Sequence, residues 1–110
     1  MAARATQALG QGARLLLTDL VLAECVYVLE SFYEVARTRI AELMRAAIAL
    51  PSIVTVDAAA LLRALEVYEV ERLDFAEAYL VAQAEITGVG KILSFDRSID
   101  KVPSVTRHEP

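Results

Sequence analysis

Short apolar runs alternate with longer helical repeats along the chain. The runs at residues 14–18 (RLLLT), 53–56 (IVTV) and 91–95 (KILSF) are bounded by turn signals, which is typical of buried strands, and residues 105–108 predict a last short strand. Between these runs, apolar residues recur at helical spacing. Because connections of that length join parallel strands by crossovers, the pattern predicts an α/β fold with a mostly parallel sheet and helices on both faces.

The helical repeats have recognisable starts and stops. Helices are predicted at residues 2–9, 20–32, 34–50, 58–68 and 74–87. Thr18 or Asp19 can cap the second of these helices, and Asp57 can cap the fourth. Pro51 ends the third helix, and Gly88 is a good C-cap for the last.

The composition fits one packed domain. The chain has 110 residues, of which 56% are apolar and 6% aromatic, and its mean hydropathy is +0.45, so aliphatic side chains must build the core. No repeat or linker divides it, and residues 1–110 are predicted to form a single domain. No stretch approaches the roughly 18 apolar residues of a membrane helix, and the N-terminus lacks the apolar segment of a secretory signal. With a single cysteine, Cys25, these features favour a cytoplasmic protein.

The charge and the motifs that the chain lacks narrow the function. The net charge of −4 disfavours a protein that holds nucleic acid through a broad basic face, so a cation or a local basic cluster would have to offset the acidity. The sequence has no glycine-rich phosphate loop after a strand and no Cys/His set with zinc spacing. Its one histidine, His108, lies in the C-terminal tail and gives Ser94 no nearby base for nucleophilic catalysis.

Two acidic residues interrupt the apolar stripes of predicted helices. Glu77 lies one turn before Leu80 and Val81 within LDFAEAYLVAQA. Glu24 likewise has Val28 one turn later within TDLVLAECVYVL. A lone ionised carboxylate on such a face costs several kcal/mol to desolvate, so each needs a partner or a function.

A third acidic residue, Asp96, follows the run KILSF at the carboxyl end of a predicted strand, where open α/β sheets bind ligands. Two unit charges about 4 Å apart repel by about 4 kcal/mol at an effective dielectric near 20, so three converging acids need protons or a cation between them. Oxygen ligands suit a hard divalent ion, Mg²⁺ or Mn²⁺. A metal held by carboxylates is suited to phosphodiester hydrolysis, because it activates water and neutralises a phosphoryl oxygen.

Each of these acids also has a local explanation. Asp74 and Glu77 have the spacing of a capping box at a helix start. Glu24 can pair with a distant arginine or hydroxyl, or lie at the edge of the apolar stripe. Asp96 can belong to an ordinary turn, in which Asp is favoured for its side-chain hydrogen bonds. The local explanations and the shared metal site therefore both stay open.

The segments TDLVLAECVYVL, LDFAEAYLVAQA and KILSFDRSID resemble three motifs of PIN-domain ribonucleases, particularly the VapC-type toxins of bacterial toxin–antitoxin pairs. The resemblance runs from about residue 13 to the C-terminus. It implies a three-layer α/β sandwich and an endoribonuclease that depends on Mg²⁺ or Mn²⁺. The residues that match the family's catalytic metal ligands are Glu24, Glu77 and Asp96.

The resemblance also implies supporting residues and partners. Ser94 matches a hydroxyl residue two positions before the last acid, and Asp100 lies where many members have a further acid. Arg97 is a candidate phosphate contact, with a solvated surface charge as the alternative. RNA would be the substrate, a cognate antitoxin would hold the enzyme inactive, and a homodimer is expected.

The chain departs from the family pattern in two places. The family has Asp where this chain has Glu77, and the extra methylene alters the geometry around a metal. No strand and no acidic residue precede Asp19, so the central first strand of the family and its Asp are expected to be missing, as in an N-terminally truncated domain. Rearrangement or a second protomer would then have to cover the gap. Two alternatives follow: a catalytically inactive remnant that binds an antitoxin or another protomer, and a purely structural α/β domain.

Overall fold

The computed structural model describes residues 13–110, and the helix predicted at residues 2–9 lies outside them. The elements follow in the order β1 (Leu15–Leu16), α2 (Asp19–Ser31), α3 (Arg37–Ala49), β2 (Ile53–Val54), α4 (Ala58–Val70), α5 (Phe75–Thr87), β3 (Lys91–Leu93), the 3₁₀ helix η1 (Arg97–Lys101) and β4 (Thr106–His108). The fold is mixed α/β with short parallel strands, which confirms the predicted fold class. None of the helices within this part of the chain is long and apolar enough to cross a membrane.

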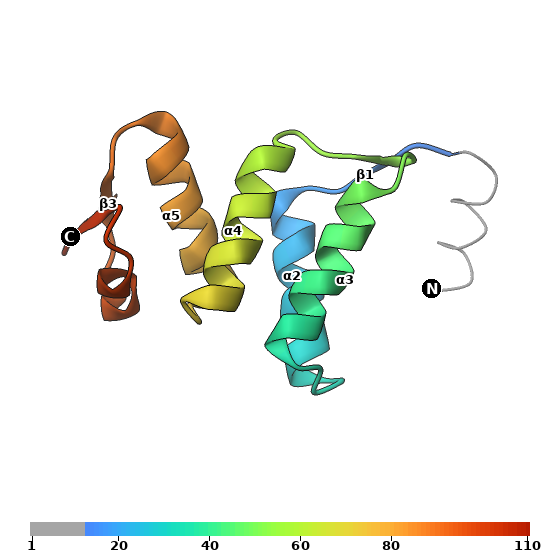
Figure 1. The fold of residues 1–110 in the computed structure, drawn as a ribbon, viewed down its shortest axis with the longest axis horizontal. Helices are drawn as coiled ribbons and strands as arrows, with labels where there is room; N and C mark the ends of the chain where they lie inside the picture. Colours follow the sequence, from blue (N-terminus) through green and yellow to red (C-terminus); the bar gives the residue numbers. More distant parts are fainter. Residues whose placement is uncertain (1–12) are drawn as a thin grey trace.

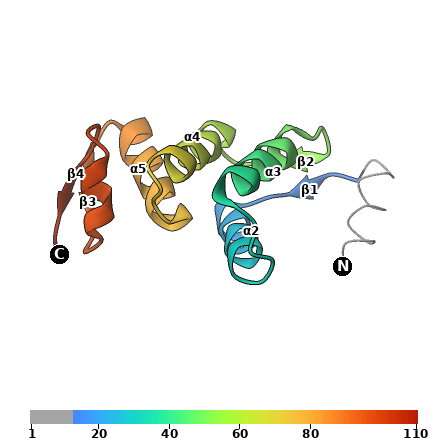
Figure 2. The same cartoon turned by 60° about the horizontal axis from the view of Figure 1, so that its bottom comes forward.

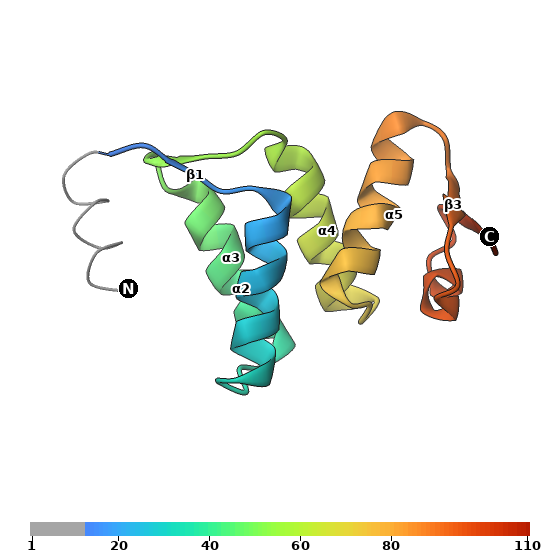
Figure 3. The same ribbon diagram turned by 180° about the vertical axis from the view of Figure 1, so that it is seen from behind.

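The strands of the described residues form two separate parallel pairs. In one pair β1 lies beside β2, with Leu15 opposite Ile53; in the other, β3 lies beside β4, with Ile92 opposite Arg107. The two pairs lie towards opposite ends of the molecule, with α4 and α5 between them (Figure 1, and from behind in Figure 3). Residues 13–110 supply no strand that joins the two pairs into one sheet.

The helices stand side by side along the long axis of a molecule that measures 46 × 29 × 22 Å (Figures 1 and 2). The most extensive helix contact is between α4 and α5, and α3 packs on the other side of α4. Both helices bury small side chains, which allow packed helices to approach closely. The fully buried alanines of these two helices are Ala60, Ala64, Ala78 and Ala82.

Most helix ends follow the local chemistry of the sequence. Thr18 caps α2, since its side chain accepts a hydrogen bond from the backbone N–H of Val21 at 3.2 Å. Asp57 caps α4 in the same way, with the backbone N–H of Ala60 at 3.0 Å. The last helix ends at Gly88, whose φ of 77° is the left-handed conformation that glycine adopts without a steric penalty.

The start of α3 differs from the sequence prediction. The helix begins at Arg37 rather than at residue 34, because Glu34 has a φ of 51° and cannot continue a right-handed helix. The backbone N–H of Val35 donates to the carbonyl of Leu29 at 2.9 Å, so the chain turns tightly between α2 and α3. The later start places the guanidinium of Arg37 within reach of the turn between α4 and α5.

Candidate functional site

Glu77 lies in the first turn of α5 and is half-buried against the end of β3. Burial is the main cause that raises the pKa of Glu77, and the negative charges of Asp96 and Asp74 raise it further. A hydrogen bond with Ser94 opposes the rise. The structure therefore brings together Glu77 from α5 with Ser94 and Asp96 from the segment after β3.

Asp96 is held by a local turn. Its Oδ1 accepts a hydrogen bond from the backbone N–H of Ser98 at 2.9 Å, and its own backbone N–H donates to the Ser94 hydroxyl at 3.0 Å. The hydrogen bonds with Ser98 are the main cause that lowers the pKa of Asp96, with help from nearby cations. The turn explanation of Asp96 is thus confirmed. The pKa values of the two carboxyl groups are therefore displaced in opposite directions, upward for Glu77 and downward for Asp96.

Asp74 occupies the N-cap position of α5, but its side chain makes no cap hydrogen bond. The capping box predicted for Asp74 and Glu77 therefore lacks the bond that Asp74 would accept. The Asp74 carboxylate is exposed and adds negative charge to the surroundings of Glu77.

Glu24 lies apart from this pair in the interactions that the structure records. Its side chain is exposed on α2, beside a shallow apolar depression of about 450 Å³ that includes Val28 and Met44. Its charge raises the pKa of Cys25, though burial of that thiol contributes more. Across residues 13–110, no three His, Cys, Asp or Glu side chains are grouped closely enough to hold a metal ion. The assignment of Glu24, Glu77 and Asp96 as a joint ligand set stays a prediction.

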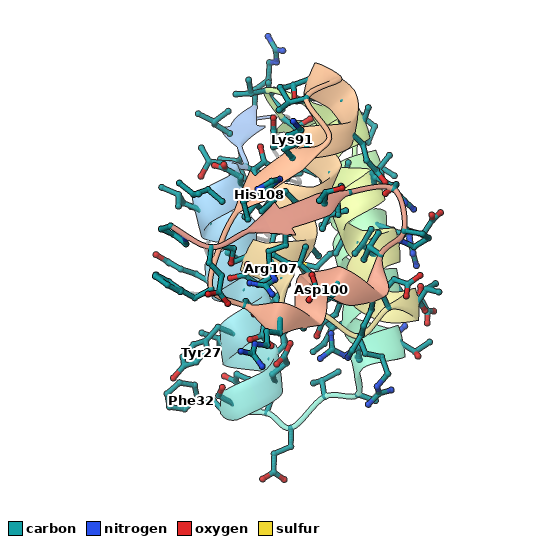
Figure 4. The ribbon with its side chains drawn as sticks, turned by 90° about the vertical axis from the view of Figure 1, so that its left-hand side faces the viewer. Tyr27, Phe32, Lys91, Asp100, Arg107 and His108 are labelled. Carbon is teal, nitrogen blue, oxygen red and sulfur yellow. The ribbon has the colours of Figure 1, made fainter. Side chains whose placement is uncertain are left out.

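Arg107, which the sequence analysis missed, lies beside Asp100 (Figure 4) and also binds the segment that carries Ser94. Its guanidinium binds both carboxylate oxygens of Asp100, at 3.1 and 3.2 Å, and donates to the backbone carbonyl of Ser94 at 3.2 Å. The alternation of side chains along β4 was the one available signal, since it places Arg107 on the opposite face from its neighbours. Arg97 is exposed at the start of η1.

The donors at this site fit a divalent metal by their chemistry. Carboxylate and hydroxyl oxygens are hard ligands, and Mg²⁺ is commonly bound by one or two carboxylates while water and substrate phosphate complete its shell. The repulsion between Glu77 and Asp96 is the interaction that a cation between them would relieve. Glu77 and Asp96, with Ser94 beside them, are therefore the described residues that would hold the ion.

Comparison with known proteins agrees with the motifs. The family model described as PIN domain matches residues 1–105, which is nearly the whole chain. No curated protein and no solved structure gives a significant match. PIN domains are a family of nucleases that generally depend on divalent metal ions. The parallel strands, the acidic residues of α5 and of the segment after β3, and this match lead to one conclusion: the chain belongs to the PIN-domain family.

Proposed function

We propose that this protein is a metal-dependent endoribonuclease of the VapC type, which hydrolyses RNA phosphodiesters with Mg²⁺ or Mn²⁺. The observation that carries the proposal is the half-buried Glu77 beside Asp96 at the carboxyl end of β3. A carboxylate that is partly desolvated next to a second one is unfavourable for stability, so it is typical of a functional site. The family supports the reaction class.

Each residue has a role in the proposed reaction. A divalent ion bound at this site would supply Lewis-acid chemistry, by activating water and neutralising charge on the phosphoryl oxygen. Glu77 and Asp96 would hold the ion, and Ser94 favours the ionised form of Glu77 that a cation needs. Glu24 is proposed as a third ligand and Arg97 as a phosphate contact. Asp100 supports the site through its ion pair with Arg107.

The proposal extends to the partners of the family. A cognate antitoxin would inhibit the enzyme, a homodimer would be the assembly, and the cytoplasm would be the compartment. The exposed aromatic side chains at the end of α2 leave an uncovered apolar surface, which supports a protein partner there. This surface includes Tyr27, Phe32 and Tyr33, which are 63%, 72% and 70% exposed.

RNA cleavage by the full chain tests the proposal. An unstructured RNA should be cut in the presence of Mg²⁺ or Mn²⁺ and left intact with a chelator. Glu77→Gln and Asp96→Asn should abolish cleavage. Glu42→Gln is the matched control, because Glu42 is exposed and pairs only with Arg39 among its recorded ion pairs. Mn²⁺ should also raise the melting temperature of the wild-type chain by mass action and not that of the two site variants. Cleavage that persists in both site variants would refute the assignment.

A second function is favoured by one specific observation. No three acidic side chains of residues 13–110 form a ready metal site, as expected for an inactive PIN domain that acts by binding an antitoxin or another protomer. Such a protein would show no RNA cleavage with either ion. It would still bind a cognate antitoxin, or associate with itself, in a sedimentation experiment.

A further inference from the structure

Arg37 connects the start of α3 to the turn between α4 and α5. Its Nη1 donates to the carbonyl of Tyr68, in the last turn of α4, at 2.8 Å. The same nitrogen donates to the carbonyl of Leu73, just before α5, at 2.6 Å. The guanidinium carbon lies 4.2 Å from the centroid of the Tyr68 ring, so the group also stacks on that ring. One side chain therefore binds both ends of the turn that precedes α5.

The position of Arg37 is unfavourable for α3 and favourable for α4. A cation at a helix N-terminus opposes the helix dipole, and α3 has no acidic residue in its first turn to offset it. At the C-terminus of a helix a cation is stabilising, and α4 has no basic residue of its own in its last turn. The guanidinium of Arg37 thus supplies to α4 the charge that the sequence of α4 lacks.

The contacts of Arg37 continue to the start of α5. Tyr68 is fully buried, and its hydroxyl donates to the carboxylate of Glu30 on α2. The Tyr68 ring packs against Phe75, the first residue of α5, with the ring centroids 6.3 Å apart. Leu73, whose carbonyl Arg37 binds, is also fully buried and lies one turn before Glu77. The turn that sets the position of Glu77 is therefore fixed from α3 through Arg37.

We propose that Arg37 is a positioning residue for the carboxylate pair Glu77 and Asp96. By binding both ends of the α4–α5 turn, it sets where α5 begins and holds Glu77 against Ser94 and Asp96. This inference rests on the proposed function, in which Glu77 and Asp96 bind a metal ion. Arg37 touches neither the metal nor the RNA and acts through the backbone of the turn and through the Tyr68 ring.

The test compares Arg37→Ala and Arg37→Lys with Arg39→Ala in the full chain. Arg39 is the matched control, because it lies on the same helix and is exposed beside Glu42. Calorimetry with Mn²⁺ alone should show affinity reduced roughly tenfold in Arg37→Ala, which is about 1.4 kcal/mol, and little changed in Arg39→Ala. Arg37→Lys should fall between them, since lysine keeps the charge and loses the stacked planar group.

Two further measurements separate positioning from general stability. Amide NMR signals of residues 75–78, and of Ser94 and Asp96, should shift in Arg37→Ala and stay in place in Arg39→Ala. Millimolar guanidinium chloride, far below denaturing concentrations, should restore both the signals and the Mn²⁺ affinity of Arg37→Ala by entering the vacated space. Sodium chloride at equal ionic strength should restore neither.

The inference is wrong if Arg37→Ala melts at a lower temperature but keeps its Mn²⁺ affinity and its signals at residues 75–78. If that variant does not fold, the same signals of Arg37→Lys decide, and unchanged signals there overturn the inference. If the wild-type chain binds no Mn²⁺, the proposed function fails. The amide shifts still show whether Arg37 positions Glu77.

Discussion

The two strand pairs are both parallel, but different side chains lie at their ends. Acidic residues follow the strands of both, and at each end a carboxylate caps the next helix: Asp57 caps α4 and Asp96 caps η1. The difference comes from α5. It directs Glu77 to the end of β3 and the phenol of Tyr79 to the pocket after β1 and β2.

This difference indicates which end is functional. A neutral phenol beside two acids can donate a hydrogen bond, and the carboxylates of Asp19 and Asp57 hold the Tyr79 proton in place, although burial contributes most to its raised pKa. At the other end, the Glu77 carboxylate is repelled by Asp96, and a bound cation would relieve this repulsion. The end at β3 and β4, where two carboxylates repel each other without a cation, is therefore the better candidate for a catalytic site.

The largest expected effect tests whether the two strand pairs are stabilised by the same hydrophobic core. Leu65 is fully buried in α4, and Leu65→Ala should lower the free energy of unfolding by about 2–5 kcal/mol, because it leaves a cavity at the centre of the helix row. Urea unfolding followed by the amide signals of Val54 and Ile92 should show both strand pairs lost in one transition. Separate transitions would mean that the two ends are independent regions.

The next effect compares the two capping acids. Asp57→Ala and Asp96→Ala each remove an acceptor for a backbone N–H, so each should cost about 1 kcal/mol of stability. Only Asp96→Ala should also abolish RNA cleavage, measured at a temperature where both variants are folded. Equal loss of cleavage in the two would remove the functional distinction between the ends.

A smaller effect appears in the pH dependence of stability. The folded pKa of Glu77 lies above its usual value of 4.5, so the folded state binds more protons in the interval between those two values. Wild-type stability should therefore decrease as pH rises through that interval, and Glu77→Gln should lack this decrease. At neutral pH the variant should be the more stable by less than about 1 kcal/mol, since solvent screens the site. Urea midpoints across the interval measure this, and parallel curves would contradict it.

The smallest effect is at the other end. Tyr79→Phe removes the hydroxyl that accepts a hydrogen bond from Gln83 at 2.8 Å and should cost about 0.5–1 kcal/mol. RNA cleavage should be unaffected, because no residue of that pocket takes part in the proposed reaction. A large loss of cleavage at unchanged melting temperature would place chemistry at the end of β1 and β2.

Local signals predicted most of the fold. Asp57 as a cap, Pro51 as the residue that stops α3 and Gly88 as a C-cap all act within one turn of the chain, and each prediction is confirmed. The start of α3 depends on the left-handed Glu34, and a glutamate gives no local sign of that conformation. The separation of the strands into two pairs is a matter of tertiary packing, which periodicity does not encode.

The candidate site was predicted only in part, because local sequence signals mark some of its residues and not others. Asp96 follows a strand and Glu77 interrupts an apolar stripe, so both have signals within their own segments. Arg37 acts on residues more than thirty positions away, and nothing near it in the sequence marks it. For Arg107, the alternation of side chains along β4 was the one local signal. Glu24 had the same signal as Glu77 and yet is exposed, because the stripe it interrupts has no covering element among the described residues.

The link between α5 and β3 contains two glycines in the left-handed backbone conformation. Gly88 and Gly90 have φ angles of 77° and 68°, and a methyl group built on either would meet no atom within 4 Å. Space for a side chain is therefore available, and only the left-handed backbone conformation disfavours an L-alanine there, by about 1–2 kcal/mol. A D-alanine at Gly88 satisfies the same angle while restricting the unfolded chain, so a mirror-image residue would tighten the link on which the distance between Glu77 and Asp96 depends.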